Sequence, residues 1–307
     1  MESVIYILTI IGIPLLSPAV LGLIRKMKAL MQSRHGASIF QPYLDLAKLF
    51  QKNEVISEDA SWIFTFAPYI VFGSTLAIAW GIPLLGTVAA LPATGDFLVF
   101  VYLIALGTFF LALAGMDTGG GFGGFGSSRE MTFAALTEGG LIFSLAGVAL
   151  MTGASTFAGM MSALQAAPLF AYLPLSLSGA AFFLALLSEN ARYPVDNPAT
   201  HLELTMVHEA MILEYSGKRL ALMEWAAGNK LLMFIVIFAN IFVPWSPAAL
   251  GTSAVAALVV LFAKITIIAG TIALIESTMS KFRFFRVPDL LFTSFVLGVI
   301  SIVIIVL

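Results

Sequence analysis

The chain has 307 residues; 60% of them are hydrophobic, only 10% are charged, and the formal net charge is −2. Soluble domains carry about 25% charged residues, so this composition excludes an ordinary soluble protein and indicates an integral membrane protein. The sequence contains no cysteine, which excludes disulfides and thiolate-ligated iron–sulfur or nickel–iron centres within it. We therefore expect no metal or cofactor on this chain, and any redox centre that serves it on a partner.

Eight apolar runs approach the length of about 20 residues that a helix needs to cross a bilayer. They predict an all-α integral membrane protein with eight transmembrane helices in a single polytopic domain, residues 1–307. The first run lacks a cationic leader and a small-residue cleavage site, so we expect a retained span. The runs are Val4–Ile24, Phe64–Ala90, Phe97–Gly115, Met131–Thr152, Phe170–Ser188, Leu231–Trp245, Ser253–Ile275 and Leu290–Leu307.

Basic residues occupy every second connection between these runs. Fourteen of the fifteen Lys and Arg residues lie in connections one, three, five and seven, and Lys264 lies inside a span. The positive-inside rule then places these connections in the cytoplasm and both termini on the outer side of the cell's inner membrane. The cytoplasmic connections are residues 25–63, 116–130, 189–230 and 276–289, and the nucleic-acid class finds no support in the near-balanced charge.

The first cytoplasmic connection predicts an amphipathic surface helix that starts at Gln41. Apolar Leu44, Leu46 and Leu49 recur among Asp45 and Lys48, which is typical of a helix lying at a membrane surface.

The third connection is rich in glycine and formally contains the G-x-G-x-x-G pattern at Gly121, Gly123 and Gly126. That pattern binds dinucleotides only between a strand and a helix, and here it follows a membrane span. We therefore expect a mobile loop that gates a cavity or holds a partner.

Four ionisable residues fall inside or at the edge of the spans: Glu138, Glu189, Lys264 and Glu276. An ionised group costs at least a few kcal/mol in hydrocarbon, so these side chains must face the bundle interior, water or each other. Two interpretations remain open at this point. The groups form ion pairs that fix helix packing, or they belong to a proton path, because a carboxylate in a low dielectric titrates near neutral pH.

The densest polar block of the chain, Ser188–Lys230, holds ten charged residues between two apolar runs. Pro194 and Pro198 end the helix that leaves the membrane, and we expect a new helix to run from there to Gly217. The block contains neither the His spacing of a zinc site nor His within a span for haem.

Scattered residues of this block and of two other connections resemble the NuoH-type membrane subunit family of respiratory complex I and its hydrogenase relatives. The matching positions are Arg34, Gly36, Gln41, Asp45 and Lys48; Arg129 and Glu138; and Glu189, Arg192, Pro194, Asp196, Pro198, Glu203 and Glu214-Tyr215-Ser216-Gly217.

The sequence departs from the complex I pattern in the charged block. Ala199 and His201 stand where the family has Glu, and Val195 replaces Phe. The stretch from Asp117 to Glu130 looks instead like the membrane subunits of group 4 energy-converting nickel–iron hydrogenases, the formate hydrogenlyase and hydrogenase-4 type. The departures weaken the expectation of a quinone site.

The resemblance implies a membrane anchor without a redox centre of its own. Hydrogenase large and small subunits would dock on the cytoplasmic face, and antiporter-like membrane subunits would receive ions from it. The implied proton path comprises Glu138, Glu189, Asp196, Glu203, Lys264 and Glu276. The implied docking face or quinone-like cavity comprises Arg34, Gln41, Asp45, Lys48, Arg129, Arg192 and Glu214. The alternatives are the quinone-site subunit of a complex I-like enzyme and, less well supported, a stand-alone transporter.

Overall fold

The structure is a computed structural model that describes residues 2–84, 91–164, 172–197, 207–243 and 254–307. Within these ranges all regular elements are helical, and the only β pairing is an isolated bridge between Asp96 and Thr156. The all-α expectation is confirmed. The elements are α1 (Glu2–Met31), α2 (Gln41–Gln51), α3 (Trp62–Gly81), η1 (Pro92–Thr94), α4 (Phe97–Asp117), α5 (Gly121–Thr152), α6 (Phe157–Leu164), α7 (Tyr172–Glu189), α8 (His208–Ile212), α9 (Gly217–Ile237), η3 (Phe238–Phe242), α10 (Ala254–Thr278), η5 (Phe284–Arg286) and α11 (Val287–Val306).

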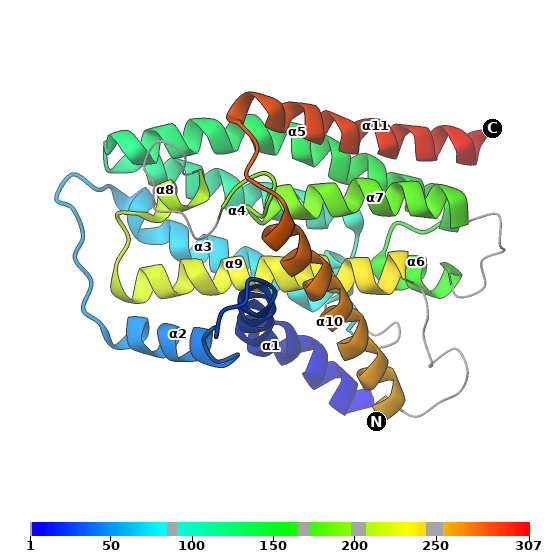
Figure 1. Ribbon diagram of the computed structural model, residues 1–307, viewed down its shortest axis with the longest axis horizontal. Helices are drawn as coiled ribbons and strands as arrows, with labels where there is room; N and C mark the ends of the chain where they lie inside the picture. The colour runs from blue at the N-terminus through cyan, green and yellow to red at the C-terminus, as the bar shows by residue number, and fades with distance from the viewer. Residues whose placement is uncertain (1, 85–90, 165–171, 198–206, 244–253) are drawn as a thin grey trace.

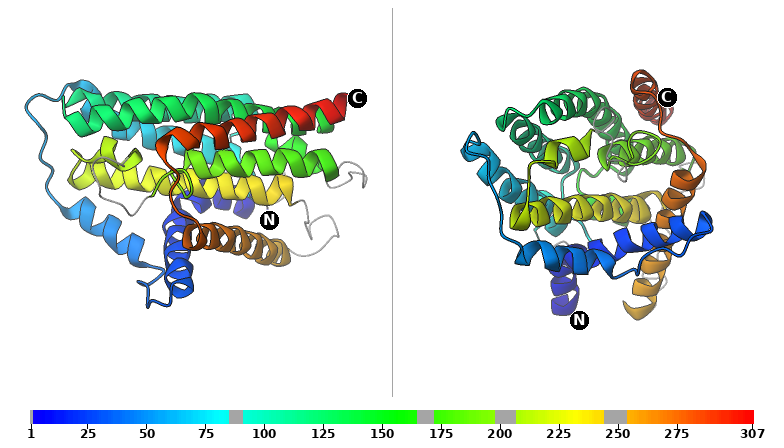
Figure 2. Two further views of the ribbon diagram at one scale, coloured as in Figure 1. Left: turned by 45° about the horizontal axis from the view of Figure 1, so that its top comes forward. Right: turned by 60° about the vertical axis from the view of Figure 1, so that its left-hand side comes forward.

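The long helices form a bundle with α9 inside it. Helices α5, α7, α9 and α11 run along the long axis, and α1 and α10 cross them obliquely (Figure 1). The two further views place α1 and α10 on the side of α9 that faces away from α5 and α11 (Figure 2). Helix α9 is therefore the element against which both halves of the bundle pack.

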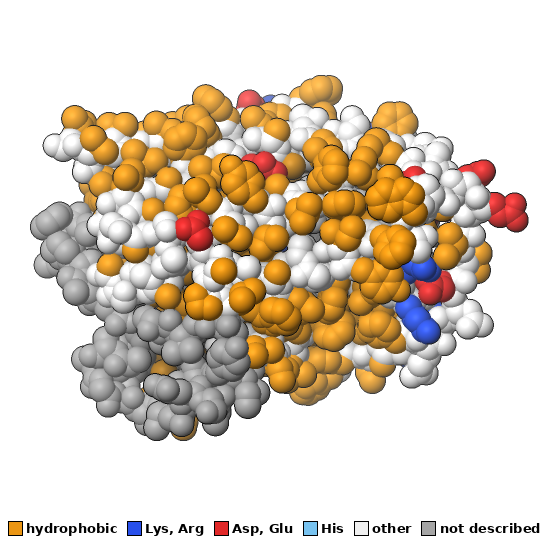
Figure 3. All heavy atoms as spheres, turned by 180° about the vertical axis from the view of Figure 1, so that it is seen from behind, with side chains coloured by type: hydrophobic (Ala, Val, Ile, Leu, Met, Phe, Trp, Pro, Cys, Tyr) orange, Lys and Arg blue, Asp and Glu red, His pale blue; other side chains and the backbone are white. Residues whose placement is uncertain are grey.

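The burial of α9 follows from its sequence. Every residue from Leu231 to Ile237 is at most 1% exposed, as expected for a helix that is hydrophobic on all sides. Phe234 lies between Phe100 and Phe182, with 5.5 Å between ring centroids in each pair. The outer helices are less buried: only 22% of the most apolar stretch of α11 is buried inside the bundle. Hydrophobic side chains cover much of the molecule's rear face, which suits contact with lipid (Figure 3).

Seven helices in the described ranges have the length and hydropathy to cross a membrane. The expected fifth span corresponds to α7, whose apolar part, Leu173–Glu189, is shorter than the other seven. Part of that span lies outside the described residues. The predicted count of eight is thus not confirmed, whereas a multi-pass membrane protein is.

The glycine-rich third connection is not a loop, and this prediction was wrong. Helix α5 begins at Gly121 and continues without a break to Thr152. A Cβ at Gly123 would overlap the backbone of Gly115 in α4, and one at Gly126 would lie 2.8 Å from the Val207 carbonyl oxygen. Glycine occurs at these positions because the backbone of α5 closely approaches the backbones of α4 and of the segment that begins at Val207.

The fifth connection is shorter than the predicted range of residues 189–230. Helix α9 begins at Gly217, so the sixth span extends over Gly217–Phe242 and its first half is polar. The helix expected to end near Gly217 ends at Ile212 in the described part of the chain. Gly217 has a φ of +54°, which glycine adopts without strain, and it starts a helix instead of ending one.

The predicted amphipathic helix at Gln41 is confirmed as α2. Its edge packs on α9, where the rings of Phe50 and Trp225 meet edge to face at a centroid distance of 6.2 Å. Lys48 remains exposed on the opposite side.

Helices α5, α7 and α11 pack through small residues. The Ser294 hydroxyl donates to the Ala181 carbonyl at 2.7 Å, and the Ser178 and Ser301 hydroxyls lie 2.8 Å apart. A Cβ at Gly298 would stand 3.0 Å from the Phe143 Cβ and 3.1 Å from the Ser144 backbone nitrogen. Small side chains allow helices in a membrane to approach closely.

We expect Gly298→Ala to destabilise the bundle, because the helix backbone of α5 cannot move away as a flexible side chain can. Overpacking of this kind costs about 1–3 kcal/mol, and thermal unfolding of the protein in detergent would measure it. Gly73→Ala is the matched control, since a Cβ there meets nothing within 4 Å; an equal effect of both changes would contradict the packing argument.

Candidate functional site

Three groups of ion pairs gather where α7 ends and the following loop begins. In the first, the Lys230 ammonium of α9 lies 2.6 Å from a carboxylate oxygen of Glu189, the last residue of α7. The Glu189 side chain is only 3% exposed. A carboxylate this deeply buried requires a charged partner, and Lys230 supplies it from the neighbouring helix.

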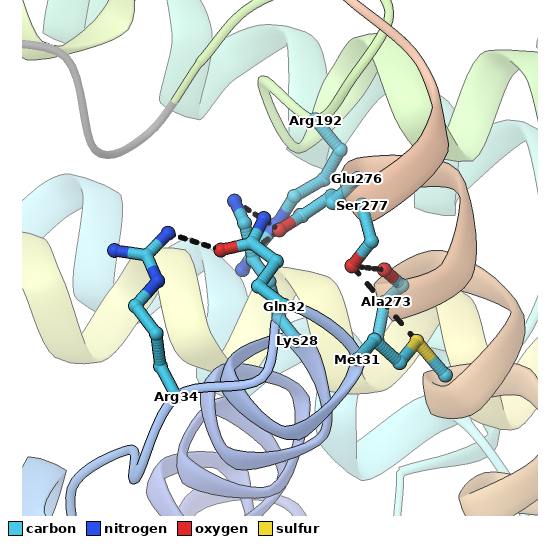
Figure 4. A network of polar contacts seen from close by, with 8 residues as sticks. All are labelled: Lys28, Met31, Gln32, Arg34, Arg192, Ala273, Glu276 and Ser277. Atoms are coloured by element: carbon cyan, nitrogen blue, oxygen red, sulfur yellow. Dashed lines mark hydrogen bonds and ion pairs between the residues drawn. The ribbon is translucent and has the colours of Figure 1, made fainter.

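The second group is a triad around Glu276 on α10. Arg192 donates to one carboxylate oxygen and Lys28 of α1 to the other, each at 3.0 Å. The Glu276 side chain is 2% exposed. Figure 4 shows both cations converging on it from different elements, with Ser277 turned toward the Ala273 carbonyl beside them. The triad joins α1, α10 and the loop after α7.

The third pair joins Asp196 of the same loop to Lys281, in the connection between α10 and α11. The loop backbone adds a hydrogen bond of 2.9 Å from the Phe282 amide to the Pro194 carbonyl. The segment after α7 is therefore tied to α1, α10 and the start of α11 by charge.

Four of these charged groups, Glu189, Arg192, Asp196 and Lys230, line a cavity of about 140 Å³ between α1, α9 and the loop after α7. Its charged and titratable lining residues are Arg25, Glu189, Arg192, Asp196, His208, Glu209, Glu224 and Lys230. A second, mainly apolar cavity of about 40 Å³ adjoins it between α3, α4 and α9. His208 and Lys230 line both cavities, so they lie between the two.

His208 is neutral at physiological pH in this setting. Its pKa is lowered to about 4, chiefly by burial and also by the positive charges of Lys230 and Arg192, while Asp196 opposes them. A neutral imidazole both donates and accepts a hydrogen bond. It can therefore pass a proton without holding a charge.

Sequence reasoning missed Glu130, His208, Lys230 and Lys28 as site residues. Glu130 lines the apolar cavity and a smaller one that also contains Glu189 and Asp196. It lies seven residues before Thr137, whose hydroxyl is 2.8 Å from that of Ser188. That spacing is a helical signal, but it was hidden because residues 116–130 were expected to be a loop.

The predicted proton-path residues separate into two groups. Glu189, Asp196 and Glu276 belong to the three ion-pair groups, and Glu138 lies one residue beyond Thr137 on α5. Lys264 lies twelve residues before Glu276 on α10, about 18 Å away along the helix axis. Its ammonium donates to the Ala239 carbonyl at 3.1 Å and to that of Val243. Glu203 lies outside the described residues.

The predicted docking residues lie mostly at the surface around this cluster. Arg34, Lys48 and Glu214 are exposed, and Arg192 is the exception, buried in the triad. Gln41 donates to Asp45 at 2.8 Å within α2. The Arg129 guanidinium lies over the rings of Phe125 and Phe284 at 5.9 and 5.6 Å from their centroids.

We expect Arg192→Ala to destabilise the protein strongly, because Glu276 would keep only the partly exposed Lys28 as a partner. Removing one side of a buried pair costs about 3–5 kcal/mol, which would appear as a lower unfolding temperature in detergent. In the double variant Arg192→Met with Glu276→Gln the charge is removed from both sides, and most of the stability should return. Failure of the second change to rescue the first would contradict the pairing argument.

The whole chain matches a known family. A family model described as NADH dehydrogenase matches residues 3–307. Hydrogenase-4 component C of Escherichia coli K12 is 35% identical over 297 residues, which is 94% of this chain and 90% of that protein. Formate hydrogenlyase subunit 4 of the same organism is 30% identical over 281 residues, 91% of each.

A solved structure supports the fold independently. A chain in the structure of the membrane-bound sulfane sulfur reductase, an archaeal respiratory membrane complex, superimposes with a TM-score of 0.83 over 99% of both chains at 21% identity. Because the family model and the two bacterial relatives cover nearly the full length, the protein belongs to the NADH dehydrogenase family.

Proposed function

We propose that the chain is the membrane-anchor and ion-coupling subunit of a multisubunit membrane-bound hydrogenase of the formate hydrogenlyase type. Two relatives are components of hydrogenase-4 and formate hydrogenlyase. Their similarity supports the assignment of this chain as a subunit of a membrane-bound respiratory complex. Nickel–iron and iron–sulfur centres are expected on large and small hydrogenase subunits that dock at the charged end of the bundle. Antiporter-like membrane subunits are expected beside it.

The single observation that carries this proposal is the ring of ion pairs around the polar cavity. Glu189 ends α7, and Asp196 lies in the loop that follows. Glu276 pairs with Arg192 of the same loop. A change of charge or position in a docked redox subunit would alter the balance of these pairs, because electrostatic interactions are strong in a low dielectric. The cavity can in this way connect redox events outside the membrane to proton uptake inside it.

We infer that the proton path starts at Glu189 and Lys230 and passes His208 and Glu130 toward the apolar cavity. Glu138 and Glu203, with Asp196 and Glu276, remain candidate members. The hydrogen bonds of Lys264 satisfy carbonyl groups where α9 changes into the π-helix Phe238–Phe242. This favours a role in helix packing for Lys264, and we place it outside the start of the path.

The docking face is proposed from six polar residues, of which Arg34, Lys48 and Glu214 are exposed and Gln41, Asp45 and Arg129 are half-buried. Helix α2 carries three of them on a rigid element packed against α9. A rigid amphipathic helix presents charges at fixed positions to a partner, which suits specific docking.

A specific feature favours the second candidate function, a quinone-site subunit of a complex I-like oxidoreductase. The apolar cavity is lined by Ile78, Ile104 and Leu111 and also by Glu130 and His208. Its walls could hold a hydrophobic ring, and its polar end could donate hydrogen bonds to the ring oxygens.

We expect Glu189→Gln to leave the complex assembled and to weaken the coupling of hydrogen turnover to ion movement. The variant keeps the side-chain volume but cannot hold the negative charge opposite Lys230. Proton uptake by membrane vesicles during hydrogen turnover would measure the coupling. The control is Glu58→Gln, an exposed carboxylate away from the cavity; normal coupling in Glu189→Gln would refute the proposed start of the path.

Thr108→Phe distinguishes the two candidate functions, since Thr108 lines only the apolar cavity among those described here. A hydrogenase subunit should keep its hydrogen turnover after the cavity is filled. A quinone-site subunit should lose quinone reduction, and the near-isosteric Thr108→Val should retain it. Both activities would be assayed in membranes that contain the full complex.

A further inference from the structure

A separate cavity of about 330 Å³ opens where α5, the loop after α7 and the start of α11 meet. Its floor is apolar and is formed by Phe133, Val195, Val207 and Val287, all of which are buried. This cavity belongs to neither of the two that contain His208 and Lys230. Of its lining residues only Arg129 has a part in the proposed function.

The rim of this cavity is cationic. Arg129, Lys281 and Arg283 line it, and Arg286 is exposed one turn beyond Arg283. Asp196 pairs with Lys281, and Asp289 is the nearest acidic residue along α11. In the described part of the chain basic side chains outnumber acidic ones at this rim, and Arg283 and Arg286 are exposed, so it suits an anionic ligand.

Aromatic rings hold the rim in place and extend it outward. The ring centroids of Phe284 and Phe133 lie 5.1 Å apart. The Arg129 guanidinium lies over the Phe284 ring, 5.6 Å from its centroid. Phe282 is 37% exposed and Phe285 is 87% exposed. Alternating basic and exposed aromatic residues, Lys281 to Arg286, are typical of the level where lipid headgroups meet acyl chains.

The cavity also lies at the right depth for a headgroup. It sits between the end of α10 at Thr278 and the start of α11 at Val287, so it marks the membrane end of both helices. Helix α5 has 32 residues, about 48 Å, which exceeds the hydrocarbon thickness of about 30 Å. Arg129, in its third turn, can therefore stand at headgroup level while Phe133, one turn further, faces acyl chains.

We propose that this cavity binds one anionic phospholipid of the adjacent leaflet. Its phosphate lies against Arg283 and Arg286, and an acyl chain lies over the apolar floor beside Phe282. Basic pockets between membrane helices bind anionic headgroups by this combination of charge and apolar contact. The proposal is independent of whether the complex evolves hydrogen or reduces quinone.

The test is a titration of the purified full complex with short-chain lipids, followed by native mass spectrometry. Dioctanoyl phosphatidylglycerol should bind to the wild type, and Arg283→Gln with Arg286→Gln should weaken that binding about thirtyfold. Both arginines are exposed, so the protein should remain folded. Phe282→Ala should also weaken binding although it leaves every charge in place. Lys52→Gln is the matched control, because it removes an exposed cation far from the cavity.

Four outcomes would overturn the proposal. Dioctanoyl phosphatidylcholine could bind as tightly as the anionic lipid, or the double variant could bind like the Lys52→Gln control. Inorganic phosphate could displace the lipid completely, which would indicate a site for soluble anions. Cross-linking of residue 282 to a partner subunit instead of lipid would assign this face to a protein interface.

Discussion

The structure depends on one constraint: a charge inside a membrane bundle must be paired there. Glu276 illustrates it, since a carboxylate that is 2% exposed receives one cation on each oxygen. The cations come from α1 and from the loop after α7, so satisfying one charge fixes three segments of the chain. The same rule joins Glu189 to Lys230 and Asp196 to Lys281. Ion pairs thus set the positions of elements that apolar packing alone would leave free to slide.

Close packing of the helix backbones is the second feature that holds the site in place. Glycine at Gly123 and Gly126 lets the beginning of α5 lie against α4 and α8, and this contact brings Glu130 to the wall of the cavities. Serine pairs at the interface of α7 and α11 satisfy their hydroxyl groups within the apolar interior. Because such contacts tolerate little change in size, the charged cluster is held by a rigid frame.

The two joined cavities explain how one architecture can serve related complexes. The polar cavity offers titratable groups to whatever docks at the charged end, and the apolar cavity beyond His208 offers space for a hydrophobic molecule or for water. Retention or loss of individual carboxylates, such as the change to Ala199 and His201 in this sequence, would shift the balance between these uses. The fold itself does not decide the chemistry, and under the proposed function the redox centres belong to partner subunits.

The sequence by itself determined the class of protein, the positions of most apolar helices, the surface helix at Gln41 and the family, because hydropathy, periodicity and motif spacing are local properties. It also indicated that Glu189 and Glu276 needed partners. Only the tertiary structure decided which partners they have, because Lys230 and Glu189 lie 41 residues apart, and Glu276 and Lys28 are separated by 248. The glycine-rich stretch is a second case in which contacts with distant parts of the chain decided the structure. Its composition suggested a loop, whereas contacts with α4 and α8, invisible in the local pattern, make it a helix and bring Glu130 into the site.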